Sequence, residues 1–280
     1  MSDLLSADFS RLMKSYAFLA AAAFCIEFPV FEILIAYYNT QEKEILFVAD
    51  NYLNSSFIVF GLVTAIFISL FIGTEYNEGT IRNKLIMGQS RVHIYLSKFI
   101  VCNVANLILQ CVFFAAVVIT CRIVSGQPLI MLFQTSFKDM ISMQLIGFYI
   151  IAAYSAVFVF LTMMISSMAV SAVVSLMIAA VLMSAGYMIG EKLSIGVIDP
   201  TLPTEQLQMI EEMSRGADIT DELRRNVLLF LDDFLPSCQA VHLSNGYVPG
   251  RAEYYIMYDL AVILVFTVTG TICYSKKEFN

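Results

Sequence analysis

The chain is too apolar for a water-soluble fold. Of its 280 residues, 59% are hydrophobic and only 14% are charged, whereas soluble domains are about 45–50% apolar and 25% charged. The net charge of -7 argues against nucleic acid as the main partner, because phosphate binding needs a concentrated basic face. Five of the six cysteines lie in or beside apolar stretches, which favours small buried side chains over a disulfide framework. The composition therefore places the chain in a bilayer.

Six apolar stretches are long enough to cross a bilayer as helices. A hydrocarbon core about 30 Å thick needs roughly 17–25 residues, because every backbone N–H and C=O must be paired within the chain. The stretches are residues 17–38, 57–73, 99–120, 143–165, 168–190 and 256–274. The first continues beyond the apolar core of about 7–15 residues that a signal peptide has, so we expect it to be retained. The sequence predicts an all-α integral membrane protein with six transmembrane helices.

The distribution of lysine and arginine predicts the orientation. With both termini in the cytoplasm, eight basic residues fall in cytoplasmic segments and three in the short external connections, as the positive-inside rule requires. The cytoplasmic ones are Arg11, Lys14, Arg82, Lys84, Arg91, Lys98, Lys276 and Lys277. The external ones are Lys43, Arg122 and Lys138. No repeat or linker divides residues 1–280, so we expect one transmembrane domain in a plasma membrane.

A hydrophilic segment, residues 74–98, separates the second and third stretches. Its pattern predicts a short helix over 80–87 that Gly88 ends, and a second helix that Ser90 caps and that continues into the third span. From the spacing alone, an ordinary basic loop fits the segment equally well.

The residues of this segment are more specific than their spacing. The run Glu75-Tyr76-Asn77-Glu78-Gly79-Thr80-Ile81-Arg82-Asn83-Lys84, with Gly88, Ser90-Arg91 and Tyr95-Leu96-Ser97-Lys98, resembles the cytosolic loop of the type-2 ABC-transporter permeases. A second run, Phe234-Leu235-Pro236-Ser237-Cys238-Gln239, is similar to the motif before the last span of that family. The resemblance implies a cytoplasmic helix over 8–14, a coupling helix over 80–87 that docks on a separate ATPase, and a helical hairpin before the sixth span. The external segment 191–255 is longer than the family pattern suggests.

The resemblance also implies that ATP is bound and hydrolysed by chains other than this one. The sequence has no GxxxxGK[ST] phosphate-binding loop, so we expect no catalytic residue and no cofactor here, with ATP and magnesium held by two partner ATPase subunits. A second permease copy, or a related permease, completes the complex. The matched coupling residues are Glu75, Glu78, Gly79, Thr80, Arg82, Asn83, Lys84, Gly88 and Arg91. We expect Arg82, Lys84 and Arg91 to contact the ATPase, and Glu75 and Glu78 to pair locally or to reach it. A solvated charged face is the alternative.

Polar side chains inside the spans are candidates for the substrate pathway. Glu27 lies near the middle of the first span, where a charge costs about 2.5–3.5 kcal/mol on insertion scales, so it should not face lipid. Glu27 either contacts a cationic substrate group or serves as a packing carboxyl. Glu32 has the same alternatives, but it lies close enough to the outer surface to be solvated, and a role without substrate contact is favoured for it. Asn103, Asn106 and Gln110 share one face of the third span, where interhelical packing is favoured over substrate contact.

The external segment contains eleven acidic and five basic residues. Its pattern predicts helices over 204–214 and 220–235, the second with Leu223, Val227, Phe230 and Phe234 along one side. The resemblance implies that residues 226–236, ending at Pro236, dip into the membrane and close an exit. Acidic residues here and in the first span favour a cationic peptide or amphiphile as the substrate, although a solvated acidic loop has the same composition.

Three functions remain open. The leading hypothesis is the membrane subunit of an ATP-driven exporter for a peptide, drug or amphiphile, in a bacterial plasma membrane. The alternatives are an ion-coupled carrier that uses Glu27 as its proton site, and a peptide sensor or immunity protein that transports nothing. No HExxH or GxSxG motif occurs, and the two histidines, His93 and His242, fall on opposite sides of the membrane, so we expect no metal site and no hydrolase.

Overall fold

The computed structural model describes the chain except for residues 40–48, 127, 129–131, 195–221, 247–251 and 278–280. The described residues are helical and contain no strand. The helices in chain order are α1 (Ser2–Lys14), α2 (Tyr16–Asn39), α3 (Ala49–Asn77), α4 (Thr80–Ile86), α5 (Arg91–Ser125), α6 (Phe137–Met164), α7 (Met168–Ser194), α9 (Glu222–Phe234), α10 (Pro236–Ser244) and α11 (Ala252–Lys276).

Six of these helices are long and apolar enough to span a membrane: α2, α3, α5, α6, α7 and α11. This finding confirms the predicted all-α class and the number of spans. Two of the helices begin earlier than the predicted apolar stretches, since α3 starts at Ala49 instead of residue 57 and α6 at Phe137 instead of residue 143. Helix α5 starts at Arg91, directly after Ser90, as predicted for the helix that continues into the third span. Hydropathy marks only the apolar part of a helix, and extending a formed helix into polar sequence requires no new nucleation.

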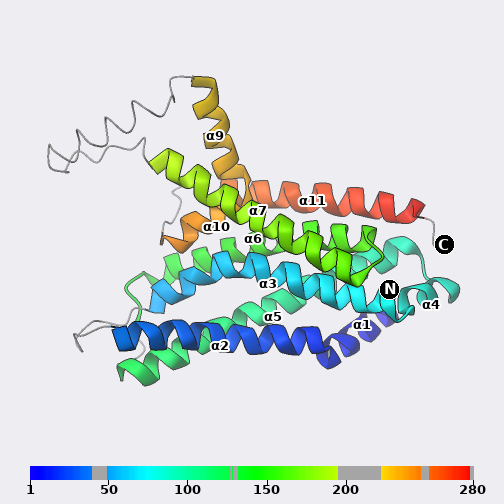
Figure 1. The fold of residues 1–280 in the computed structure, drawn as a ribbon, viewed down its shortest axis with the longest axis horizontal. Coiled ribbons are helices and arrows are strands. Elements are labelled where there is room, and N and C mark those ends of the chain that lie inside the picture. Colours follow the sequence, from blue (N-terminus) through cyan, green and yellow to red (C-terminus); the bar gives the residue numbers. More distant parts are fainter. Residues whose placement is uncertain (40–48, 127, 129–131, 195–221, 247–251, 278–280) are drawn as a thin grey trace.

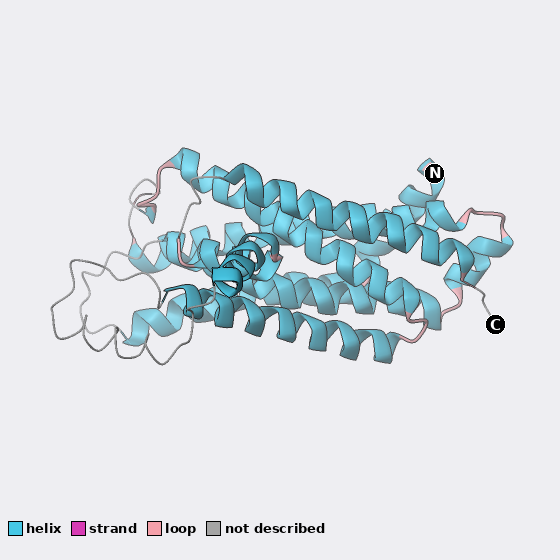
Figure 2. Cartoon of the chain, turned by 90° about the horizontal axis from the view of Figure 1, so that it is seen from above, coloured by secondary structure: helices cyan, strands magenta, loops and turns pink. Residues whose placement is uncertain are grey.

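The long helices run along one common direction (Figures 1 and 2). Helices α1 and α4 lie at one end of the bundle, together with the end of α11, and α9 and α10 lie toward the other. We call these the elbow end and the hairpin end. Helices α3 and α6 form the centre, since 67% of the most apolar window of each is buried, against 17–33% in the other four spans.

At the hairpin end, the predicted helix over 220–235 is confirmed as α9, which ends at Phe234. A second helix, α10, begins at Pro236 and was not among the predicted helices. Helix α10 is largely buried and packs against α3, α6 and α7, whereas α9 extends away from the bundle (Figure 1). The other predicted helix, over 204–214, lies outside the described residues.

The predicted exit residues are spread over both of these helices. Val227 and Phe230 are exposed, while Pro236 is buried, and the side chain of Leu223 lies outside the described part. The rings of Phe230 and Phe234 stack at 5.4 Å, and both contact Tyr258 of α11 edge-on. The aromatic contact fixes the base of α9 against the last span.

Candidate functional site

The segment between α3 and α5 forms a sharp elbow. Gly79 and Gly88 flank α4 with φ angles of 68° and 81°, a left-handed conformation that glycine adopts without steric strain. The Ser90 hydroxyl accepts a hydrogen bond of 3.2 Å from the backbone N–H of His93 and so caps α5. The glycine stop and the serine cap are therefore confirmed, and α4 ends at Ile86, one residue before the predicted end.

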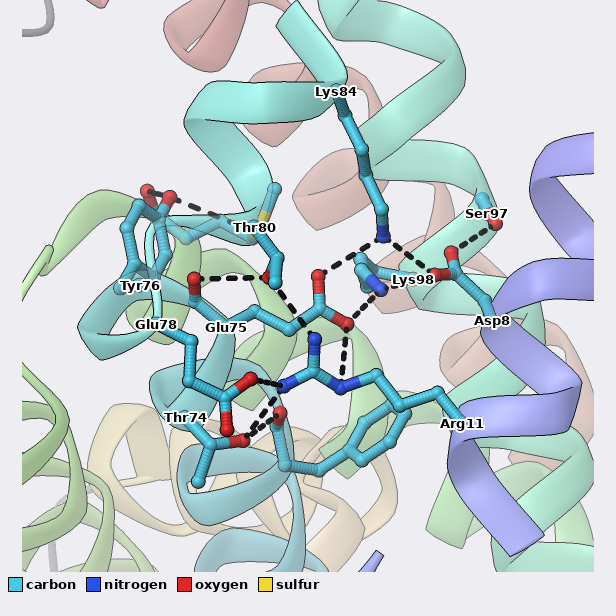
Figure 3. Close-up of polar contacts among 12 residues, drawn as sticks. Asp8, Arg11, Thr74, Glu75, Tyr76, Glu78, Thr80, Lys84, Ser97 and Lys98 are labelled. Atoms are coloured by element: carbon cyan, nitrogen blue, oxygen red, sulfur yellow. Dashed lines mark hydrogen bonds and ion pairs between the residues drawn. The ribbon is translucent and has the colours of Figure 1, made fainter. Parts of the chain in front are cut away.

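Four charged side chains meet beneath α4. We call Asp8, Glu75, Lys84 and Lys98 the elbow cluster (Figure 3). Lys84 Nζ lies 2.6 Å from Asp8 Oδ1 and 3.1 Å from Glu75 Oε2. Lys98 Nζ lies 2.7 Å from Asp8 Oδ1 and also pairs with Glu75. Asp8, Glu75 and Lys98 are each at most 1% exposed, so the cluster is a buried group of two cations and two anions that joins α1, α3, α4 and α5.

Arg11 closes the rim of this cluster from α1. Its guanidinium donates to Glu78 Oε2 at 2.7 Å and to the Thr80 hydroxyl at 3.0 Å, and its Nε lies 3.7 Å from Glu75 Oε1. Thr80 Oγ1 in turn donates to the backbone carbonyl of Glu75. These bonds hold the start of α4 against both α1 and the end of α3 (Figure 3).

Burial and charge pairing shift the pKa values of the elbow cluster in opposite directions. Burial alone would raise the pKa of Asp8, but the charge of Lys98 and hydrogen bonds from Lys84, Lys98 and Ser97 hold that pKa below its ordinary value. Burial would lower the pKa of Lys84, but Glu75 and Asp8 raise it. For both groups the shift favours the charged form, whereas for Lys98 burial outweighs the charges of Glu75 and Asp8 and lowers the pKa.

The other side of α4 is exposed. Ile86 is 75% and Met87 71% exposed, and Arg82 and Asn83 are also exposed. Arg82 forms no hydrogen bond or ion pair with any residue that the structure describes. We call Arg82, Asn83, Ile86 and Met87 the elbow face. It combines a cation with two large apolar side chains, which is a composition typical of a contact surface.

The remaining predicted coupling residues are engaged within the chain. Arg91 donates from Nη1 to the backbone carbonyls of Ser275, at 3.1 Å, and of Lys277. A cation at this position satisfies carbonyls at the carboxyl end of α11. Lys84, expected to contact the ATPase, and Glu75, expected to pair locally or to reach it, are bonded inside the elbow cluster. Glu78 binds Arg11.

Asp8, Arg11 and Lys98 belong to this site although the sequence interpretation did not assign them to it. A signal for Asp8 exists in α1, because Leu4, Asp8 and Leu12 are four residues apart on one face, and all three are buried. A carboxylate within an apolar stripe requires a buried partner. The identity of that partner, on a helix 90 residues away, does not follow from the stripe.

The polar residues of the spans do not converge on one site. Glu27 is exposed on α2, and Glu32 accepts a bond of 3.0 Å from the Ser55 hydroxyl of α3. Asn103 bonds a carbonyl of its own helix, and Asn106 is buried without a partner among the described residues. Gln110 donates to the Gln144 side chain of α6 at 3.1 Å, which is an interhelical packing bond.

No group of three or more His, Cys, Asp or Glu side chains in the described part of the chain is arranged to hold a metal ion.

A family described as ABC-2 family transporter protein matches residues 4–186, which is more than half of the 280 residues and includes α1 and the elbow. The comparison with curated proteins gave no match. Six membrane-spanning helices are the architecture expected of a permease. The chain is a multi-pass membrane protein and belongs to the ABC-2 family of transporter proteins.

Proposed function

We propose that the chain is the permease subunit of an ATP-driven exporter, with ATP and magnesium bound by two separate ATPase subunits that dock on the elbow face. One observation carries the proposal: α4 is exposed on one side and fixed by the buried elbow cluster on the other. A partner that moves α4 therefore also moves the ends of α1, α3 and α5.

The charges of the cluster hold α4 firmly to α1, α3 and α5. Removing one member of a buried ion pair typically costs 3–5 kcal/mol, because the other charge is left unpaired in a medium of low dielectric constant. Separating α4 from α1 or α3 would expose or unpair these charges. The lowest-energy response to a push on α4 is displacement of the helices as rigid bodies, which is how packed helices switch between two states.

In this proposal the coupling residues have different roles. Arg82, Asn83, Ile86 and Met87 contact the ATPase, while Glu75 and Lys84 transmit the movement from within the cluster. Gly79, Thr80 and Gly88 set the angle of the elbow, and Glu78 and Arg91 hold its two flanks. The elbow end then lies in the cytoplasm, where the ATPase is, and both termini lie there with it.

The exposure of Glu27 supports a substrate pathway between two permease copies. An exposed carboxylate in the middle of a span costs about 2.5–3.5 kcal/mol if it faces lipid. A second permease copy, with a water-filled route between the two, removes that cost. A carboxylate on this route favours a cationic peptide or amphiphile as the exported substrate, and the acidic external segment has the same sign of charge.

The test compares two isoleucines that are equally exposed. Ile86 of the elbow face is 75% exposed, and Ile123, at the hairpin end of α5, is 76% exposed. The permease is co-expressed with the ATPase subunit, identified by its GxxxxGK[ST] loop, and purified through a tag on the permease. We expect Ile86→Glu to abolish copurification and ATPase stimulation, and Ile123→Glu to preserve both.

Equal retention of the ATPase by the two variants would contradict docking on the elbow face. The same experiment separates the other functions, because an ion-coupled carrier and a peptide sensor require no ATPase. Transport by the purified permease alone, driven by an ion gradient, would replace the exporter hypothesis with the carrier.

A further inference from the structure

Two cavities meet at Ala17, near the elbow end of α2. The first, of about 380 Å³, lies between α2 and α3, and its described lining is entirely apolar, from Ala17 to Phe28 on α2 and from Val59 to Leu70 on α3. We call it the trough. The second, of about 500 Å³, is lined mainly by polar residues of α1, of the α1–α2 junction and of the end of α3, and we call it the mouth. Because Ala17 lines both, the two cavities adjoin there, and we call the pair, with its polar and its apolar part, the groove.

The trough has the length of one leaflet of a bilayer. Ala17 and Phe28 are eleven residues apart on a helix, as are Val59 and Leu70, which corresponds to about 16 Å. This is roughly half of a hydrocarbon core about 30 Å thick. The trough is also open to the outside of the bundle, because Phe24 and Ile66 on its walls are 42% and 44% exposed.

The mouth has the chemistry of a site for an anionic headgroup. Among the described residues that line it, the cations are Arg11 and Lys14 and the one carboxylate is Glu78, which Arg11 binds at 2.7 Å. Lys14 is exposed and forms no ion pair with a described residue. Tyr16, on the same rim, is 89% exposed, and tyrosine concentrates at the membrane interface. A lysine at this level attracts anionic lipids with about 1 kcal/mol.

We propose that the groove binds one anionic phospholipid, with its phosphate at Lys14 and one acyl chain in the trough. The polar and apolar parts occur in the order that a lipid in the leaflet at the elbow end requires. The headgroup then lies beside Arg11, the residue that fixes Glu78 and Thr80 at the start of α4. The proposal does not depend on the presence of an ATPase, since every residue of the groove belongs to this chain.

Native mass spectrometry of the full purified chain tests the proposal. The probes are phosphatidylglycerol and phosphatidylcholine with identical acyl chains, titrated separately. We expect one phosphatidylglycerol to bind at a lower concentration than phosphatidylcholine. Lys14→Glu should weaken phosphatidylglycerol binding by at least about fivefold, the factor that corresponds to about 1 kcal/mol per lysine. Lys276→Glu, an equally drastic change at an exposed lysine of the same end, should leave it unchanged.

The apolar part has its own matched pair. Ala20 lines the trough, whereas Ala23, one turn further along α2, is exposed and does not line it. Ala20→Phe should fill the trough and weaken binding of both lipids, and Ala23→Phe should not. Size-exclusion chromatography identifies variants that fail to fold, and Ala20→Leu then replaces Ala20→Phe.

Three results would overturn the proposal. Equal affinity for the two lipids would remove the headgroup site, and an effect of Lys14→Glu without an effect at Ala20 would remove the trough. Displacement of the lipid by millimolar inorganic phosphate would identify a site for free anions instead.

Discussion

Lys84 Nζ of α4 lies 2.6 Å from Asp8 Oδ1 of α1, across 76 residues of sequence. The contact joins the short helix of the elbow to the first helix of the chain, and Lys98 reaches the same carboxylate oxygen from α5. Asp8 is thus shared by two lysines from two helices. Its removal should affect the attachment of α1 and of α4 together.

Asp8 and Lys98 should be strongly coupled in their effect on stability. Asp8→Asn leaves the two lysines with one carboxylate, and we expect it to lower the free energy of unfolding by about 3–5 kcal/mol. Lys98→Met should have a similar effect. The double variant keeps the neutral pair of Glu75 and Lys84, so its loss should be clearly smaller than the sum of the single losses. Thermal unfolding in detergent measures all three, and additive losses would show that the two side chains act independently.

Acid should release α1 from the elbow. The pKa of Asp8 is held below its ordinary value of 3.8, so its ionisation stabilises the folded state fully above that value. This contribution is lost as the pH falls through the lowered pKa of the folded state. After correction for the intrinsic exchange rate, which itself falls in acid, the protection of α1 against hydrogen exchange should therefore decrease in acid more than that of α6. The Asp8→Asn variant should exchange rapidly in α1 already at neutral pH, and a steep acid response of α1 that persists in this variant would assign the effect to another group.

Local patterns predicted much of the elbow, because its determinants are local. Gly88 is a helix stop and Ser90 a helix cap in any context that allows these turns, and both function so here. The six spans were predictable for the same reason, since each must contain enough consecutive apolar residues to cross the hydrocarbon core of the bilayer.

The elbow cluster depends on tertiary contacts and could not be read from the spacing. Lys84 has the pattern of an exposed lysine on a short helix, yet α1 and α3 cover it with carboxylates. The predicted helix over 220–235 ends directly before Pro236, as α9 does, but the helix α10 that follows was not predicted. Pro236 is at the first position of a new helix, where its missing N–H is not needed.

The stability of the α9–α10 junction should decrease as the pH rises above 6.5. His242 of α10 lies 2.8 Å from Asp232 of α9, and this hydrogen bond raises the pKa of His242 above 6.5, against the opposing effect of burial. A raised pKa means that the contribution to stability is fully present below pH 6.5 and is lost as the pH rises through the pKa of the folded state. Hydrogen exchange at the α9–α10 junction should therefore increase with pH beyond the intrinsic rate. His242→Gln should abolish this extra increase, and a junction whose protection is independent of pH in the unaltered chain would refute the prediction.

Two glycines of α7 should respond in opposite directions to the same substitution. A Cβ at Gly186 would lie 2.8 Å from the backbone oxygen of Ser237 in α10, a contact that only a shift of the hairpin backbone relieves. We expect Gly186→Ala to destabilise the protein by about 1–3 kcal/mol, the usual range for overpacking.

At Gly190 the nearest atom, Val241 Cγ1, would be 3.9 Å from the new methyl group, which is an ordinary contact. Gly190→Ala should therefore show only the gain of about 0.5–1 kcal/mol that alanine has over glycine inside a helix. Thermal unfolding of the two variants tests this difference. Both replace glycine by alanine inside α7, so the gain in helix propensity is the same, and only the atoms next to the new methyl group differ. If both variants gained stability, α10 would not be seated against α7 at Gly186, and the buried position of the hairpin would have to be abandoned.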